Sequence, residues 1–68
     1  MTLGEAVRNR RRNLGMIQTD IEGVSQRSIS ELERDRVNPR LGTVLLIVRQ
    51  LGGQVEICWD DQATDRLF

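Results

Sequence analysis

Residues 23–33 read GVSQRSISELE, and this stretch decides the expected fold. A glycine-containing turn comes first. Ser25 follows as a good N-cap, because its hydroxyl can accept a free backbone N–H of the first helical turn. The next residues predict a short amphipathic helix from about residue 26 to residue 34, in which Ile29 and Leu32 face inward.

The outer face of this predicted helix is suited to DNA. Gln26 and Arg27 stand at its front, where their forked donors and acceptors match base edges in the major groove, and Ser30 is the next candidate. Ser25 and Ser28 are expected to cap the helix or to contact phosphate, which sets position without reading sequence. A capped helix with these residues after a turn has the form of a helix-turn-helix recognition helix.

Two further helices are predicted on the N-terminal side of the turn. Thr2 and Glu5 have the spacing of a capping box, so one helix is expected to begin near Leu3 and to end at Gly15. Residues 18–22 predict a short second helix.

A fourth helix is predicted from residue 41 or 43 to Leu51, after the loop signal of Asn38 and Pro39. Apolar residues surround nearly its whole circumference. This pattern indicates burial on two sides, against the core and against a second subunit, with Val48 and Leu51 in the subunit contact.

Residues 54–59 alternate apolar and polar side chains and predict one strand. Its backbone groups need a partner, and no second strand pattern is visible. The simplest partner is the same strand of a second copy, which makes Val55, Ile57 and Trp59 dimerisation residues. The alternative is a disordered tail. Residues 60–68 are expected to form an acidic, flexible tail.

Charge is segregated along the chain, although its net charge is zero. Residues 1–53 hold nine arginines against six acidic residues, a net charge of +3, and residues 54–68 have a net charge of −3. Every basic residue is arginine, which favours bidentate phosphate and guanine contacts, although genome composition is an alternative cause. Four loop residues are candidates for phosphate contacts, the alternative being a solvated loop: Arg34, Arg36, Asn38 and Arg40.

Other function classes find little support. The chain has one cysteine, Cys58, and no histidine, so neither a metal site nor an enzyme is expected, and no cofactor is implied. No apolar run approaches a membrane span, and arginines interrupt any signal-peptide pattern at the N-terminus. These features favour a cytoplasmic protein with no membrane partner.

Three features occur together in this chain: Gln18, the turn of residues 23–25, and the Ile-Ser-x-x-Glu pattern that ends at Glu33. In this combination the chain resembles the Cro/lambda-repressor-like helix-turn-helix family. Further motifs are most similar to HipB-type antitoxins, over roughly residues 3 to 59: Leu3-Gly4 with Ala6-Val7, Arg10-Arg11-Arg12, Leu14-Gly15-Met16, Leu41-Gly42-Thr43, and Leu51-Gly52 leading to Val55-Glu56-Ile57.

This resemblance implies a mainly α, four- to five-helix lambda-repressor-like DNA-binding domain over residues 1–53, with the strand of residues 54–59 pairing across a dimer. In the family, the residues that match Arg11 and Glu33 form a buried ion pair that fixes the angle of the recognition helix. The residue that matches Gln18 holds a phosphate and braces the front of that helix. The alternatives are two solvated charges and an ordinary helix-start glutamine.

The chain departs from the family pattern at three places. The segment between Gln18 and the turn is shorter by nearly one helical turn, Ile17 stands where Thr or Ser usually caps, and Asp35 replaces a glycine. Either the second helix is a single turn, or DNA binding is degraded.

The expected function is therefore sequence-specific repression by a homodimer on a palindromic operator in double-stranded DNA. The resemblance implies an antitoxin that autoregulates a HipBA-like toxin–antitoxin operon and binds a HipA-like kinase toxin. Two alternatives remain open. One is a degenerate helix-turn-helix that serves only toxin binding or dimerisation, and the other is a phage-type repressor without a toxin.

Overall fold

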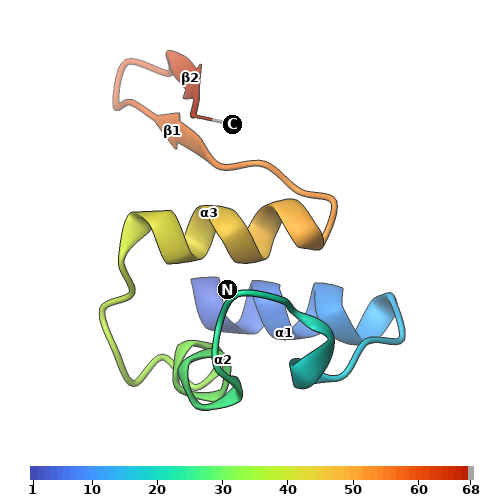
Figure 1. The fold of residues 1–68 in the computed structure, drawn as a ribbon. Coiled ribbons are helices and arrows are strands. Elements are labelled where there is room, and N and C mark those ends of the chain that lie inside the picture. The colour runs from blue at the N-terminus through green and yellow to red at the C-terminus, as the bar shows by residue number, and fades with distance from the viewer. Residues whose placement is uncertain (68) are drawn as a thin grey trace.

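Three α-helices pack around one apolar core, and a β-hairpin extends beyond them in the computed structural model (Figure 1). The structure describes residues 1–67, and none of the helices within them is long and apolar enough to cross a membrane. The elements in chain order are α1 (Leu3–Asn13), the 3₁₀ turn η1 (Gln18–Asp20), α2 (Gln26–Glu33), α3 (Leu41–Gln50), β1 (Glu56–Cys58) and β2 (Thr64–Arg66).

The first two α-helices begin at the predicted caps. Thr2 Oγ1 accepts a hydrogen bond from the backbone N–H of Glu5 at 3.1 Å, and Ser25 Oγ accepts one from that of Ser28 at 3.2 Å. Each bond satisfies a backbone donor that the first helical turn leaves free. Both predicted N-caps are therefore confirmed.

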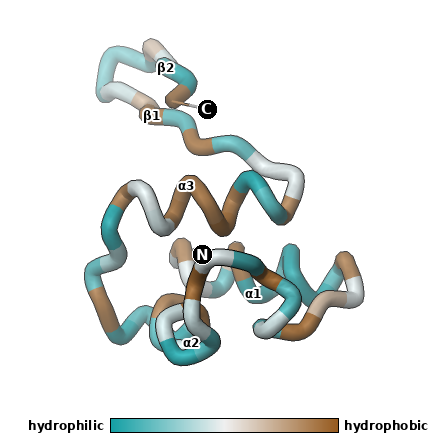
Figure 2. The backbone as a smooth tube through the Cα atoms, viewed as in Figure 1, coloured by the Kyte–Doolittle hydropathy of each residue, from teal (hydrophilic) through white to brown (hydrophobic). Residues whose placement is uncertain are grey.

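The core lies where the three helices meet the chain that follows η1. Ile29 of α2 and Ile47 of α3 are completely buried at its centre. Figure 2 shows that the middle of α3 is strongly apolar, which fits its central position between the other helices and the hairpin. The other buried apolar residues are Val7, Ile21, Leu32, Val44 and Leu51.

Gly4 allows α1 to approach the end of α2 closely. A Cβ at this position would overlap the backbone carbonyl oxygens of Leu32 and Glu33. The carboxylate of Asp35 fastens the same contact, because it accepts hydrogen bonds from Thr2 Oγ1 at 2.6 Å and from Gly4 N at 3.2 Å. The start of α1 is thus joined to the residues just after α2.

The prediction of a four- to five-helix domain is wrong. Within residues 1–67 the structure has three α-helices, and the segment expected to form a short second helix makes only η1. Its hydrogen bonds, from Asp20 N to Ile17 O and from Ile21 N to Gln18 O, span three residues. Gly23 turns the chain at φ +79°, which leaves too few residues for cooperative α-helical bonding.

The prediction of a single strand that pairs across a dimer is also wrong. β1 covers residues 56–58 of the expected 54–59, and it pairs antiparallel with β2 of the same chain, with Ile57 opposite Asp65. Sequence reasoning missed β2 because Thr64–Arg66 has no apolar alternation. The turn gave no signal either, because Gln62 occupies the positive-φ position where hairpins favour glycine.

The hairpin stands apart from the helical core. α3 lies between the hairpin and the layer formed by α1 and α2 (Figure 1). All residues of β1 and β2 are exposed. The segment expected as an acidic tail, residues 60–68, thus contains the turn and β2, and its last position, 68, lies outside the described residues.

Candidate nucleic-acid interface

The outer face of α2 carries the residues expected to read DNA. Gln26, Arg27 and Ser28 are exposed, and Ser30 is half-buried. The Arg27 side chain is 89% exposed, and its Nε lies 3.1 Å from Glu31 Oε1 one helical turn further on. An exposed pair of this kind contributes little stability, so a nucleic acid can displace it at low cost.

The two serines at the start of α2 bind each other. Besides accepting from the Ser28 N–H, Ser25 donates its own hydroxyl proton to Ser28 Oγ at 2.9 Å. These bonds fix the first turn of α2. The backbone N–H groups of such a turn, with the positive end of the helix dipole, favour a phosphate group nearby.

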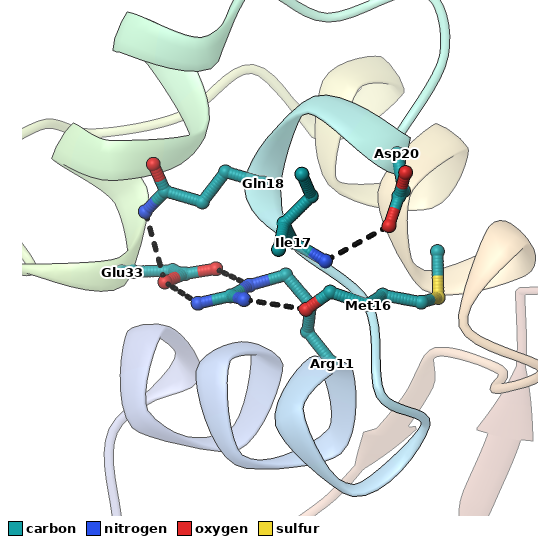
Figure 3. Close-up of polar contacts among 6 residues, drawn as sticks. All are labelled: Arg11, Met16, Ile17, Gln18, Asp20 and Glu33. Carbon is teal, nitrogen blue, oxygen red and sulfur yellow. Dashed lines mark hydrogen bonds and ion pairs between the residues drawn. The ribbon is translucent and has the colours of Figure 1, made fainter.

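A buried ion pair fixes the other end of α2. Arg11 of α1 holds the Glu33 carboxylate with two parallel hydrogen bonds, Nε to Oε2 at 2.7 Å and Nη2 to Oε1 at 2.9 Å (Figure 3). The Arg11 Nη1 also donates to the carbonyl of Met16 at 2.7 Å. The side chains are only 9% and 2% exposed, so the ion pair implied by the resemblance is present and its charges are not solvated.

Gln18 completes this cluster from η1. Its Nε2 donates to Glu33 Oε1 at 3.2 Å, so in this structure it braces the C-terminal end of α2 rather than the front (Figure 3). Burial by itself would raise the pKa of Glu33. The hydrogen bonds from Arg11 and Gln18 and the charges of Arg11 and Arg8 outweigh burial, so the pKa of Glu33 lies below its ordinary value of 4.5. Its hydrogen bond to Arg11 correspondingly raises the pKa of the guanidinium.

The loop between α2 and α3 adds exposed polar side chains beside α2. A hollow of about 370 Å³ separates the two, with Ser28 and Glu31 on the α2 side and Pro39 and Arg40 on the loop side. Arg40 is therefore brought next to the outer face of α2. The other loop candidates are also exposed: Arg34, Arg36 and Asn38.

One contact that sequence reasoning missed holds the turn before α2. The side-chain amide of Gln50, at the end of α3, accepts from the backbone N–H of Glu22 at 2.8 Å and donates to the carbonyl of Glu22 at 2.7 Å. The Gln50 amide thus both accepts from and donates to the backbone of one residue, as a residue of a paired β-strand does. No local pattern marks this role, because the two residues are 28 positions apart.

The residues expected at a dimer interface fall into two groups. Leu51 is a core residue, and Val48 beside it is half-buried. Val55 is half-buried, while Ile57 and Trp59 are exposed on the hairpin. Of these five residues, only Ile57 and Trp59 are exposed.

Comparison with protein-family models, with curated proteins and with solved structures found no match. The interpretation of this surface therefore depends on its geometry and chemistry.

Proposed function

We propose that the chain binds duplex DNA by placing α2 in the major groove. The observation that carries this proposal is a capped, rigidly held helix with a polar outer face. Ser25 caps its start, and the Arg11–Glu33 pair anchors its end. Gln26 and Arg27 then present to the solvent the side chains that hydrogen-bond to adenine and guanine edges.

The arginines around α2 suit the phosphate backbone. The loop after α2 carries three exposed arginine side chains, those of Arg34, Arg36 and Arg40. Arg40 lines the same hollow as Ser28 of α2. In the proposed complex these residues neutralise phosphates on the flanks of the groove, and Gln26 and Arg27 read the bases between them.

The proposal extends to a homodimer that represses transcription at a palindromic operator, since two copies related by a two-fold axis match two half-sites. The resemblance to HipB-type antitoxins supports a finer proposal, an autoregulating antitoxin that acts in the cytoplasm and binds a HipA-like kinase toxin. That the chain is a member of this antitoxin family is part of the same proposal.

A second candidate function follows from η1. A segment of three residues, Gln18–Asp20, precedes the turn in place of a full helix, and that helix normally crosses the DNA backbone. A chain with this change could serve only as a protein-interaction module, through dimerisation or toxin binding.

Selection of duplexes from a random pool, followed by fluorescence anisotropy, separates the two functions. We expect an enriched palindrome whose affinity falls as salt rises. Arg27→Ala should weaken binding to the selected duplex by about 1–3 kcal/mol and bring it closer to binding of scrambled DNA. Arg40→Ala should weaken both duplexes alike and flatten the salt dependence.

Arg66→Ala is the matched control, because it removes the same charge from the hairpin, far from α2 (Figure 1). It should leave selectivity unchanged. No enrichment, or equal effects of Arg27→Ala on both duplexes, would favour the protein-interaction module.

A further inference from the structure

The side chain of Arg8, on α1, has a buried donor atom with no acceptor. Its Nε is shielded from solvent and forms no hydrogen bond within residues 1–67. No ion pair joins Arg8 to an acidic side chain in that part of the chain either. A buried donor without an acceptor costs free energy, and a charged group costs more than a neutral one. Arg8 is therefore a cation that lacks a counter-ion in direct contact.

The helical repeat places Arg8 on the side of α1 that faces α2. Gly4, one turn earlier, is where a Cβ would overlap the backbone oxygens of Leu32 and Glu33. Arg11, three residues later, holds the Glu33 carboxylate. Arg8 lies between these two contacts and is half-buried at the junction of α1 and α2.

Glu33 cannot serve as the missing acceptor, because both of its carboxylate oxygens are engaged. Oε2 accepts from Arg11 at 2.7 Å, and Oε1 accepts from Arg11 at 2.9 Å and from Gln18 at 3.2 Å (Figure 3). Arg8 acts on Glu33 only through its charge, which helps to lower the pKa of that carboxyl. Two arginines thus share one acid, and 2 − 1 leaves this cluster with a net charge of +1.

The chemistry of arginine limits what can complete the cluster. A guanidinium presents its donors in a rigid, planar fork, which fits two oxygens of one phosphate or carboxylate group. Phosphate is the better candidate here, because Arg8 lies beside the helix that is proposed to enter the major groove. A duplex carries phosphates along both edges of that groove.

We infer that Arg8 binds a phosphate group of the DNA backbone at the junction of α1 and α2. This inference rests on the proposed function for the source of the phosphate, and a free phosphate shares the same chemistry. The contact extends the interface from α2 to α1. It sets position and affinity without reading sequence.

Arg8→Met tests the contact, because methionine keeps an apolar stem and removes the charge. Fluorescence anisotropy should show affinity falling about five- to tenfold at 0.1 M salt for the selected duplex and for scrambled DNA alike. The slope of log affinity against log salt should become shallower by about 0.9, the value for one phosphate. Arg8→Lys should restore the slope with part of the affinity, since lysine has the charge without the fork.

Arg10→Met is the matched control. Arg10 is two residues further along α1 and therefore lies on the opposite side of the helix, where its Nε donates to Leu51 O at 3.0 Å. Its removal takes the same charge from α1 and should leave the salt slope unchanged.

Thermal unfolding separates this role from simple support of α2. The Arg8→Met midpoint should be nearly the same as that of the parent, because the lost attraction to Glu33 is offset by removal of an unbonded buried donor. A lowered midpoint with an unchanged salt slope would assign Arg8 to the support of α2 and overturn the inference. An unchanged slope with an unchanged midpoint would overturn it as well.

NMR spectra test the site without relying on DNA. The Arg8 Nε–H is shielded from water, so its signal should be observable, and its loss in Arg8→Lys assigns it. Titration with inorganic phosphate at constant ionic strength should shift this signal more than that of the exposed Arg66. A short duplex should shift it too.

The two arms distinguish the sources of the phosphate and the two proposals. A shift with inorganic phosphate in a chain that binds no duplex would support the site, with a free phosphate as its ligand, and defeat the proposed function. A duplex that binds without changing the Arg8 signal would defeat the inference alone. No shift of that signal with either probe would overturn the inference.

Discussion

Arg11 and Glu33 make the stability of this small core depend on two charges at once. Either Arg11→Met or Glu33→Leu leaves the partner charge buried without compensation. We expect each single change to lower the free energy of unfolding by roughly 3–5 kcal/mol, and the double change to be much milder. Urea denaturation followed by circular dichroism measures all three.

Arg27→Ala is the control for this set, because its partner Glu31 is an exposed neighbour on the same helix. It should cost under about 1 kcal/mol. Small, additive effects of the Arg11 and Glu33 changes would contradict a buried, coupled pair.

Because the pKa of Glu33 is lowered in the folded protein, the free energy of unfolding depends on pH. The folded protein binds the Glu33 proton more weakly than the unfolded chain does, so this group stabilises the fold fully above about pH 4.5. Its contribution is lost as pH falls below that value through the pKa of the folded state. Unfolding free energies measured from neutral pH downward should show this decline, and Glu33→Gln should reduce its slope. An equal slope in that variant would assign the decline to other carboxylates.

Asp35 combines a backbone cost with a side-chain benefit. It has a positive φ of 56°, which side-chain-bearing residues adopt at a cost, but its carboxylate binds Thr2 and Gly4. Asp35→Ala loses those bonds and keeps the cost, so we expect it to destabilise by about 1–3 kcal/mol. Asp35→Gly removes the cost as well and should lie between the parent and alanine variants in thermal melts. Equal losses for both would show that the backbone cost is negligible.

The sequence reveals only half of this balance. The resemblance predicts a glycine at the position of Asp35, whereas the contact that compensates for the aspartate there comes from Thr2, 33 positions earlier. The same separation hides the Gln50 contact with the turn. Residues that act through a distant partner are beyond local sequence patterns.

At the scale of elements, the sequence predicted the features that depend on neighbouring residues and missed those that depend on distant residues. Thr2 and Ser25 predicted two helix starts, because a cap acts on the turn that follows it. η1 ends instead at Ile21, which is buried among core residues of all three helices. β2 depends on β1 for its backbone partners, and its own residues carry no strand signal.

The hairpin register predicts opposite effects of proline at neighbouring positions. Trp59 N donates to Ala63 O, and Leu67 N donates to Val55 O. Ile57 lies midway between these pairs, so it occupies the same hydrogen-bonded type of position, whereas Glu56 directs its N–H to the outer edge. Ile57→Pro should disrupt the hairpin and Glu56→Pro should not, as judged by the Trp59 indole resonance in NMR spectra. Equal disruption by both prolines would contradict this register.

At the scale of the whole molecule, the hairpin contributes nothing to the buried core. Removal of residues 55–68 should therefore leave the helical content of residues 1–54 nearly unchanged in circular dichroism, because the core residues all lie before residue 52. Loss of helicity on truncation would show that the hairpin supports the helical body as well.

The segregation of charge gives the molecule a permanent electric dipole, with the acidic hairpin at one end and the basic helical body at the other (Figure 1). In the field of a polyanion such a molecule experiences a torque before contact, even though its net charge is zero. The torque turns the helical body toward the polyanion and the hairpin away from it. Orientation of this kind weakens as ions shorten the range of the field, so added salt should slow encounter as well as weaken binding.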